Sequence, residues 1–283
     1  MRDDITLADL WQILRERWWV VIAGTVLSTA LAVFIAFTSK PVYRAEAVLV
    51  PVSENQNNGG LSSLASQFSG IASLVGVTLD PGNDRRTEAL AVLRSRALTR
   101  AFVEDNDLLP ILFSEQWDTK KEGWKSDDPK KIPTLWDADQ LFASKIRKVS
   151  EDRDAGLVTV AIEWSDPELA AKWVMELIER TNAHLRKAAI ERSERNIAYL
   201  EKQANSTSVV ELRQSIYRLI EGEINTIMLA QGSEDYAFRV IDPAVVPQEP
   251  VRPKRPMIIA VGFASGVALS CVFLLFFAEP RRS

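Results

Sequence analysis

Two long uncharged segments, one near each end of the sequence, constrain this chain more than any other feature. Residues 18–37 and residues 257–278 are almost entirely apolar. At a rise of about 1.5 Å per residue, either segment forms a helix long enough to cross a bilayer core of about 30 Å. We therefore predict two transmembrane helices at these positions, which place both termini on one side of a membrane and residues 38–256 on the other.

A cleaved signal peptide is the alternative for the first segment. The preceding residues mix acidic and basic side chains, and the FTSKP sequence that follows lacks an A-x-A cleavage pattern. We therefore expect a retained helix. Residues 6–17 carry apolar side chains at helical spacing, so they form either a helix on the membrane surface or an extension of the first span.

Basic residues flank both faces of the predicted membrane segments. Those on the terminal side are Arg2, Arg15, Arg17, Arg281 and Arg282, and those on the loop side are Lys40, Arg44, Arg252, Lys254 and Arg255. The positive-inside rule compares the numbers of Lys and Arg residues on the two sides of the membrane, and here these numbers are equal. The charges therefore do not assign the loop to either side.

Regularly spaced prolines precede the second span. Within residues 243–256, they are Pro247, Pro250, Pro253 and Pro256. Proline fixes φ and has no backbone N–H, so a proline at every third residue predicts an extended, semi-rigid polyproline strut.

The loop between the spans predicts an α+β fold in which two transmembrane helices flank an α/β body with a long helical hairpin arm. Alternation and β-branched residues predict strands, and apolar spacing predicts helices. The predicted strands are 42–52, 156–164 and 236–242, the predicted shorter helices are 84–109 and 138–149, and residues 110–137 are expected to be irregular.

The arm is predicted from a helical pattern over residues 167–204 and a return helix over 209–231. Asp166 and Pro167 give the first helix an N-cap and a proline at its first position. The second half of this helix is nearly all charged, so it is expected to project from the body and to contact the return helix or neighbouring subunits.

A G-x-x-x-G motif lies inside the second span, formed by Gly262 and Gly266. Small residues allow membrane helices to approach closely and to gain dispersion contacts that lipid cannot match. Together with the polar arm, this motif favours a homo-oligomer.

The sequence offers no catalytic constellation, so we expect no enzyme, no catalytic residue, no cofactor and no metal site. It contains one histidine, His184, and one cysteine, Cys271, which lies within the second span. Phosphate-binding and nucleophile-elbow motifs are missing. A net charge of −4 with interspersed signs argues against a nucleic-acid partner. Three tryptophans in residues 110–137 either stack on sugar rings or, as we expect, hold that segment onto the body.

The sequence resembles the Wzz-type polysaccharide co-polymerases, the O-antigen chain length determinants of bacterial inner membranes. Four segments carry the resemblance. They are DLWQILRERWW before the first span, SKPVYRAEAVLVP after it, VTVAIEWSDPELAAKWV at the start of the long helix and VIDPAVVPQEPVRPKRP before the second span.

The resemblance implies cytoplasmic termini, residues 1–17 and 279–283, and a periplasmic chain-length-determinant domain, residues 38–256. It also implies a membrane-embedded homo-oligomeric ring, often an octamer, which controls how many repeat units a Wzy-type polymerase adds to a lipid-linked polysaccharide. The family sets length by scaffolding, so no catalytic residue carries over.

The particular polymer stays open, because residues 61–77 resemble segments of the exopolysaccharide and capsule branch. The alternative function is a periplasmic adaptor of a capsule or exopolysaccharide export system, although such adaptors tend to have longer arms. A sugar-cleaving enzyme would need two facing carboxylates about 5–9.5 Å apart, and nothing in the sequence requires such a pair.

Overall fold

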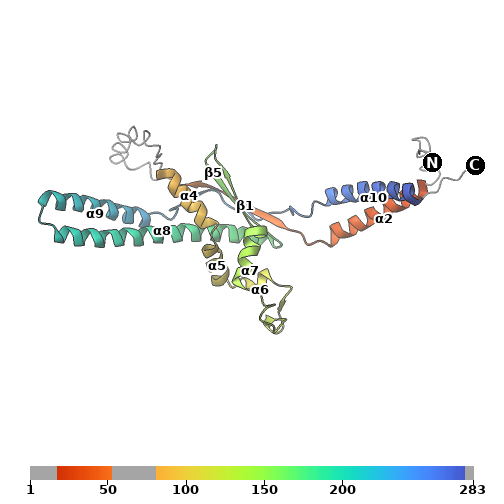
Figure 1. Ribbon diagram of the computed structural model, residues 1–283, viewed down its shortest axis with the longest axis horizontal. Helices are drawn as coiled ribbons and strands as arrows, with labels where there is room; N and C mark the ends of the chain where they lie inside the picture. The colour runs from red at the N-terminus through yellow and green to blue at the C-terminus, as the bar shows by residue number, and fades with distance from the viewer. Residues whose placement is uncertain (1–17, 53–80, 278–283) are drawn as a thin grey trace, which may run out of the picture. The chain divides into compact units, whose positions relative to one another are not determined.

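The computed structural model describes residues 18–52 and 81–277 (Figure 1). It divides into two compact units. Of the described residues, 18–43 and 248–277 belong to one, here called the helix-pair unit, and 44–52 and 81–247 belong to the other, here called the α/β unit. The segments 6–17, 61–77 and 279–283 discussed above lie outside the described residues.

The helix-pair unit consists of two apolar helices packed side by side, α2 (Trp18–Thr38) and α10 (Arg255–Phe277) (Figure 1). Both are long and apolar enough to cross a membrane. Beyond the helices, the backbone N–H of Val42 donates to the carbonyl of Arg252 at 2.9 Å, and the N–H of Val251 donates to the carbonyl of Val42 at 2.8 Å. The segments that leave the two helices are thus tied together.

The α/β unit is built on a four-stranded sheet, which confirms the predicted mixed fold class. The strands are β1 (Tyr43–Pro51), β4 (Arg147–Asp152), β5 (Leu157–Trp164) and β6 (Phe238–Asp242), in the order β4-β5-β1-β6. Along β1, Ala45, Ala47 and Leu49 are buried, whereas Arg44 and Glu46 are exposed. One face of the sheet therefore packs on the core and the other is open.

Strand β4 corrects the prediction of a helix over 138–149. Helix α7 (Leu135–Leu141) continues as a short π-helix, η3 (Phe142–Ile146), and the chain then becomes a strand at Arg147. All six residues of β4 pair antiparallel with β5, from Arg147 opposite Ile162 to Asp152 opposite Leu157. Strand pairing between segments thus overrides the local helical pattern.

The predicted helix over 84–109 is also wrong, because the chain breaks into three helices, α4 (Pro81–Leu93), α5 (Arg96–Asp105) and α6 (Leu109–Leu112). At the first break, Ser95 adopts an extended conformation and its hydroxyl accepts a hydrogen bond from the N–H of Leu98 at 3.1 Å. Ser95 is therefore the N-cap of a new helix.

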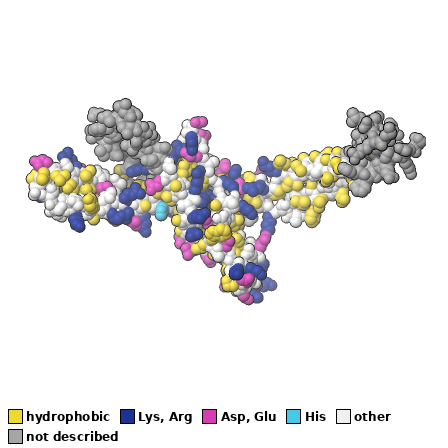
Figure 2. All heavy atoms as spheres, in the orientation of Figure 1, with side chains coloured by type: hydrophobic (Ala, Val, Ile, Leu, Met, Phe, Trp, Pro, Cys, Tyr) yellow, Lys and Arg dark blue, Asp and Glu magenta, His cyan; other side chains and the backbone are white. Residues whose placement is uncertain are grey.

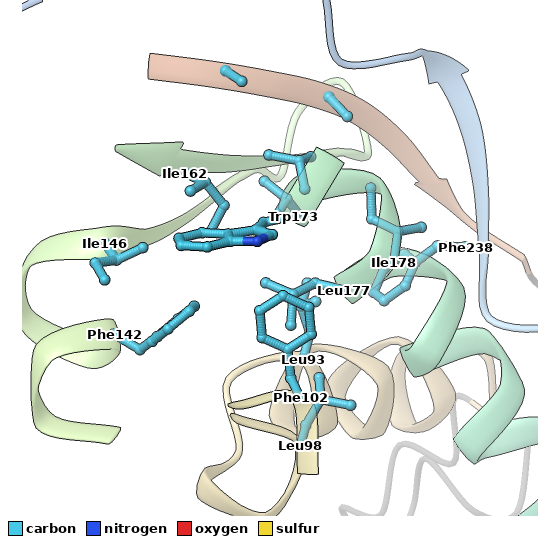
Figure 3. Close-up of a cluster of buried hydrophobic side chains, with 14 of the residues drawn as sticks. Leu93, Leu98, Phe102, Phe142, Ile146, Ile162, Trp173, Leu177, Ile178 and Phe238 are labelled. Atoms are coloured by element: carbon cyan, nitrogen blue, oxygen red, sulfur yellow. The ribbon is translucent and has the colours of Figure 1, made fainter. Parts of the chain in front are cut away.

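The core lies between the sheet and the start of α8 (Pro167–Ser206) (Figure 3). Trp173 is 2% exposed, and its ring centroid is 5.4 Å from that of Trp164 and 6.3 Å from that of Phe102. Figure 3 shows Trp173 and Leu177 among Phe102, Phe142 and Ile162. The apolar face predicted for the first half of the long helix is thus the face that packs against the core.

The arm is the second half of α8 packed against α9 (Val210–Gln231) (Figure 1). Asp166 accepts hydrogen bonds from the N–H groups of Glu168 and Leu169, as expected of its N-cap position. Toward the tip, Ala204, Ile216 and Ile220 form a small apolar cluster separate from the main core. The arm therefore holds its two helices together with contacts of its own.

Candidate functional surfaces

Gly262 and Gly266 lie on the face of α10 that packs against α2. A Cβ atom added to Gly262 would lie 2.3 Å from the Cβ of Ala32, and one added to Gly266 would lie 2.8 Å from the Cβ of Ser28. Real Cβ atoms do not approach so closely, so a larger residue at either position would push the helices apart. The close approach predicted from the G-x-x-x-G motif is made to α2 of the same chain.

Hydroxyl groups reinforce this packing inside the apolar helices. Ser28 Oγ donates to the carbonyl of Gly262 at 2.9 Å, and Ser265 Oγ donates to the same carbonyl at 3.0 Å. On the α2 side, Gly24 makes the same kind of close approach, to Ser270. Small residues and one interhelical hydrogen bond thus hold α2 and α10 together.

The spaced prolines fall in both units. Pro247 belongs to the α/β unit, and Pro250, Pro253 and Pro256 belong to the helix-pair unit. Residues 243–254 contain no helix or strand, but Pro256 lies in the first turn of α10, where its missing N–H costs no helical hydrogen bond, so the predicted strut over 243–256 is too long at its end. The hydrogen bonds between Val42 and residues 251–252 show, however, that part of this segment is paired with the chain leaving α2.

Helix α9 presents an apolar stripe that is not covered by the described part of the chain. The stripe consists of Val210, Tyr217, Ile224 and Met228, which are between 44% and 59% exposed. These residues are seven, seven and four positions apart and so share one helical face. The residues that pack toward α8, Ile216 and Ile220, lie on another face. Such an exposed apolar stripe is typical of a helix–helix interface.

This stripe was not predicted, although its signal is present in the sequence. The prediction was that the charged second half of α8 contacts the return helix or neighbouring subunits. The apolar residues at heptad spacing, Val210, Tyr217 and Ile224, are in the return helix. The spacing of the apolar residues alone does not show that α8 packs against the face with Ile216 and Ile220, or that the face with the stripe stays exposed.

Two of the three tryptophans in residues 110–137 pack against each other within that segment. Strands β2 (Trp117–Asp118) and β3 (Gly123–Trp124) form a small hairpin. The rings of Trp117 and Trp124 meet edge to face, with centroids 5.0 Å apart. Trp136, in α7, is 55% exposed. The paired rings therefore stabilise the hairpin itself, and the expected attachment of this segment to the body by its tryptophans stays a prediction.

Buried charged groups in the α/β unit are engaged by neighbouring elements. The guanidinium of Arg147 donates to Thr99 Oγ1 and to the carbonyl of Arg94, each at 2.9 Å. Burial lowers the pKa of Arg147, and the nearby Asp139 carboxylate partly offsets this effect. Asp139 in turn lies 3.3 Å from Nε of Arg96. This network joins α5, α7 and β4 and is structural.

The open sheet face carries a depression of about 440 Å³ beside β4. The basic side chains that line it are Arg44, Arg94, Arg147 and Lys148, and each has a partner within the protein. Arg44 lies 3.1 Å from the Glu163 carboxylate, and Lys148 Nζ donates to the carbonyl of Ser144 at 2.8 Å. Within residues 18–52 and 81–277, no group of three His, Cys, Asp or Glu residues could hold a metal ion, and His184 is exposed.

Comparisons with known proteins place these features in a family. Residues 3–105 match the model of the Wzz family, described as chain length determinant protein. Residues 205–277 match the GNVR model, described as "G-rich domain on putative tyrosine kinase". A comparison with curated proteins found no matching sequence.

Two solved structures are similar to the chain at low identity. One is described as a full-length bacterial polysaccharide co-polymerase, at 12% identity and a TM-score of 0.43, over 96% of this chain and 97% of that chain. The other is a fragment of WzzB, a polysaccharide co-polymerase from Salmonella Typhimurium, at 11% identity and a TM-score of 0.32, over 75% of this chain and 100% of that chain.

The two matched models together span more than half of the chain and include both apolar helices and the return helix of the arm. The chain thus carries a Wzz chain length determinant domain, followed by a GNVR domain that includes the return helix of the arm and α10.

Proposed function

We propose that this protein is a non-enzymatic inner-membrane co-polymerase that oligomerises and sets the chain length of a lipid-linked surface polysaccharide made by a Wzy-type polymerase. The family assignment supplies the functional class. The observation that carries the proposal is the apolar stripe of α9, because a scaffold that acts by assembly needs a surface on which copies can associate.

The stripe suits a second copy of this chain as its partner. Fully burying an exposed large apolar side chain contributes about 1.5–3 kcal/mol, and the four stripe residues, which are about half exposed, would each gain roughly half of that when a neighbouring copy covers them. Each added copy would cover the stripe of a neighbour, and a ring, with eight copies as one possible number, would leave no stripe uncovered. The family is known to oligomerise, which supports this part of the proposal.

The proposed topology places both termini in the cytoplasm and residues 38–256 in the periplasm, so that the α/β unit meets the growing polysaccharide. Two helices of sufficient length and apolarity support a double crossing. The internal pairing of the charged groups in the α/β unit supports a scaffolding function.

Deletion of the gene in its host tests the function directly. Surface and cell-associated polysaccharide would be resolved by size on a gel, with a strain that carries the restored gene as the control. For a length regulator, we expect polymer to reach the surface with its clustered length distribution replaced by short, random chains. Loss of surface polymer with accumulation inside the cell would instead identify an export adaptor and refute the proposal.

A further inference from the structure

In the described part of the helix-pair unit, the charged residues gather at one end of the two apolar helices. Within residues 18–43 and 248–277, the charged side chains are Lys40, Glu249, Arg252, Lys254 and Arg255. All of them lie after the body of α2 or at and before the first residue of α10. Four of the five are basic, and these four are here called the basic cluster.

Contacts between the two segments hold the basic cluster together. The backbone pairing of Val42 with Arg252 joins the chain just after Lys40 to the chain just before Lys254. The guanidinium carbon of Arg255 lies 4.9 Å from the ring centroid of Phe37, within the range of a cation–π contact. Both helix ends therefore contribute cations to the same region.

An apolar surface adjoins two of these cations. Lys254 and Arg255 line a shallow depression of about 430 Å³ whose other walls are Val251, Met257 and three prolines, Pro250, Pro253 and Pro256. Lys254, Arg255 and Met257 are exposed. A site with cations beside apolar carbon suits a ligand that has an anionic group joined to hydrocarbon.

The positive-inside rule does not account for the basic cluster in the proposed topology. That rule concerns Lys and Arg residues on the cytoplasmic side of a membrane. If residues 38–256 are periplasmic, as the proposed function has it, the basic cluster lies on the opposite side. Lys254 and Arg255 are then exposed on the side of the membrane that the rule does not address.

We propose that the basic cluster binds the phosphate group of an anionic membrane lipid, with Lys254 and Arg255 as the contacting residues. An arginine guanidinium can bind a phosphate through two parallel N–H···O bonds, and lysine adds a compact positive charge. The lipid tail lies along Met257 and the exposed side chains of the apolar helices. The site thereby fixes the depth at which the helix pair sits in the bilayer.

Native mass spectrometry of the full chain in a neutral detergent tests this site. Binding of phosphatidylglycerol would be titrated against phosphatidylcholine for the wild type and for the Lys254→Gln/Arg255→Gln variant. Each basic residue near an anionic membrane surface contributes about a five-fold gain in binding, so the double variant should bind phosphatidylglycerol about 25-fold more weakly.

A variant with the same loss of charge elsewhere is the control. Lys187 and Arg195 are exposed on α8, and Lys187→Gln/Arg195→Gln should bind phosphatidylglycerol like the wild type. Unchanged binding by the Lys254→Gln/Arg255→Gln variant would overturn the proposal, as would equal wild-type affinity for phosphatidylcholine. Displacement of the lipid by millimolar inorganic phosphate would overturn it too, by showing that the headgroup phosphate alone is recognised.

Circular dichroism would verify that the double variant is folded, and Lys254→Gln alone, with an expected five-fold loss, replaces it if it is not. No polysaccharide takes part in this assay. Failure of lipid binding is therefore distinguishable from failure of length regulation, which the gene deletion measures separately.

Discussion

Replacement of Asn182 by alanine should separate the long helix from the strand that leads to the prolines. Asn182 is 5% exposed in α8. Its Nδ2 group donates to the carbonyl of Phe238 at 2.8 Å, and its Oδ1 atom accepts from the N–H groups of Ala237 at 3.0 Å and Phe238 at 2.8 Å. One side chain therefore satisfies three backbone groups at the start of β6.

The expected cost follows from these three bonds. A hydrogen bond contributes about 1 kcal/mol net, and a buried polar group that loses its partner costs about 1–3 kcal/mol. Alanine recovers only about 0.5 kcal/mol through its higher helix propensity. Asn182→Ala should therefore destabilise the protein by roughly 3 kcal/mol, which lowers the melting temperature by about 6–12 °C for a domain of this size.

Thermal melting of the full chain in detergent, followed by circular dichroism at 222 nm, measures this effect. Asn196→Ala is a matched control on the same helix, because Asn196 is exposed and its Nδ2 group donates only to the Glu223 carboxylate, at 2.8 Å. We expect the control to melt within about 2 °C of the wild type. Equal shifts for the two variants, or no shift for Asn182→Ala, would refute the reasoning.

Three further perturbations address the helix pair and the arm. Gly262→Leu should destabilise the packing of α2 on α10, because even a Cβ atom at this position would clash with Ala32. Gly222→Leu on α9, where the added side chain meets open space, is the control. The melting temperatures of both variants in detergent test this, and a Gly262→Leu protein as stable as the wild type would contradict it. Ile224→Glu places a charge in the α9 stripe and should reduce the particle mass measured by light scattering, whereas the control Glu221→Gln should leave the mass unchanged. An unchanged mass for Ile224→Glu would exclude the α9 stripe as the interface. Replacement of residues 197–220 by a short turn should leave the main core folded but change polysaccharide length on a gel, because this segment contains the whole of the arm's separate apolar cluster. Loss of folding would instead make the arm part of the core.

The sequence predicted elements whose signals are local. Asp166 and Pro167 mark the start of α8 through capping chemistry, and the apolar face with Trp173 correctly indicated its buried side. The alternation in β1 likewise reflects one buried and one open sheet face, whereas in β5 residues 160–163 are buried on both faces. In each of these cases, the residue pattern and the tertiary environment require the same local structure.

The wrong predictions concern segments whose structure depends on the element that they pack against. Residues 147–149 have no strong strand signal, and they become β4 because β5 lies beside them. The break at Ser95 depends on a serine within an otherwise good helical run, which acts as a cap once the chain turns. The G-x-x-x-G motif signalled a close helix approach, but a motif does not specify its partner, which is α2.

Because the glycines of α10 pack against α2 of the same chain, they are not available for contacts between copies inside a bilayer. The surfaces of α2 and α10 that remain outward carry bulky side chains, including Leu27, Phe34, Phe263 and Leu269. Lipid tails pack against such side chains about as well as another helix does, so these surfaces provide little preference for association. On the arm, by contrast, the competitor is water, and covering the α9 stripe gains the full hydrophobic driving force. Subunit number would then be set by the geometry of the arm, while the membrane helices remain separated by lipid and free to adjust.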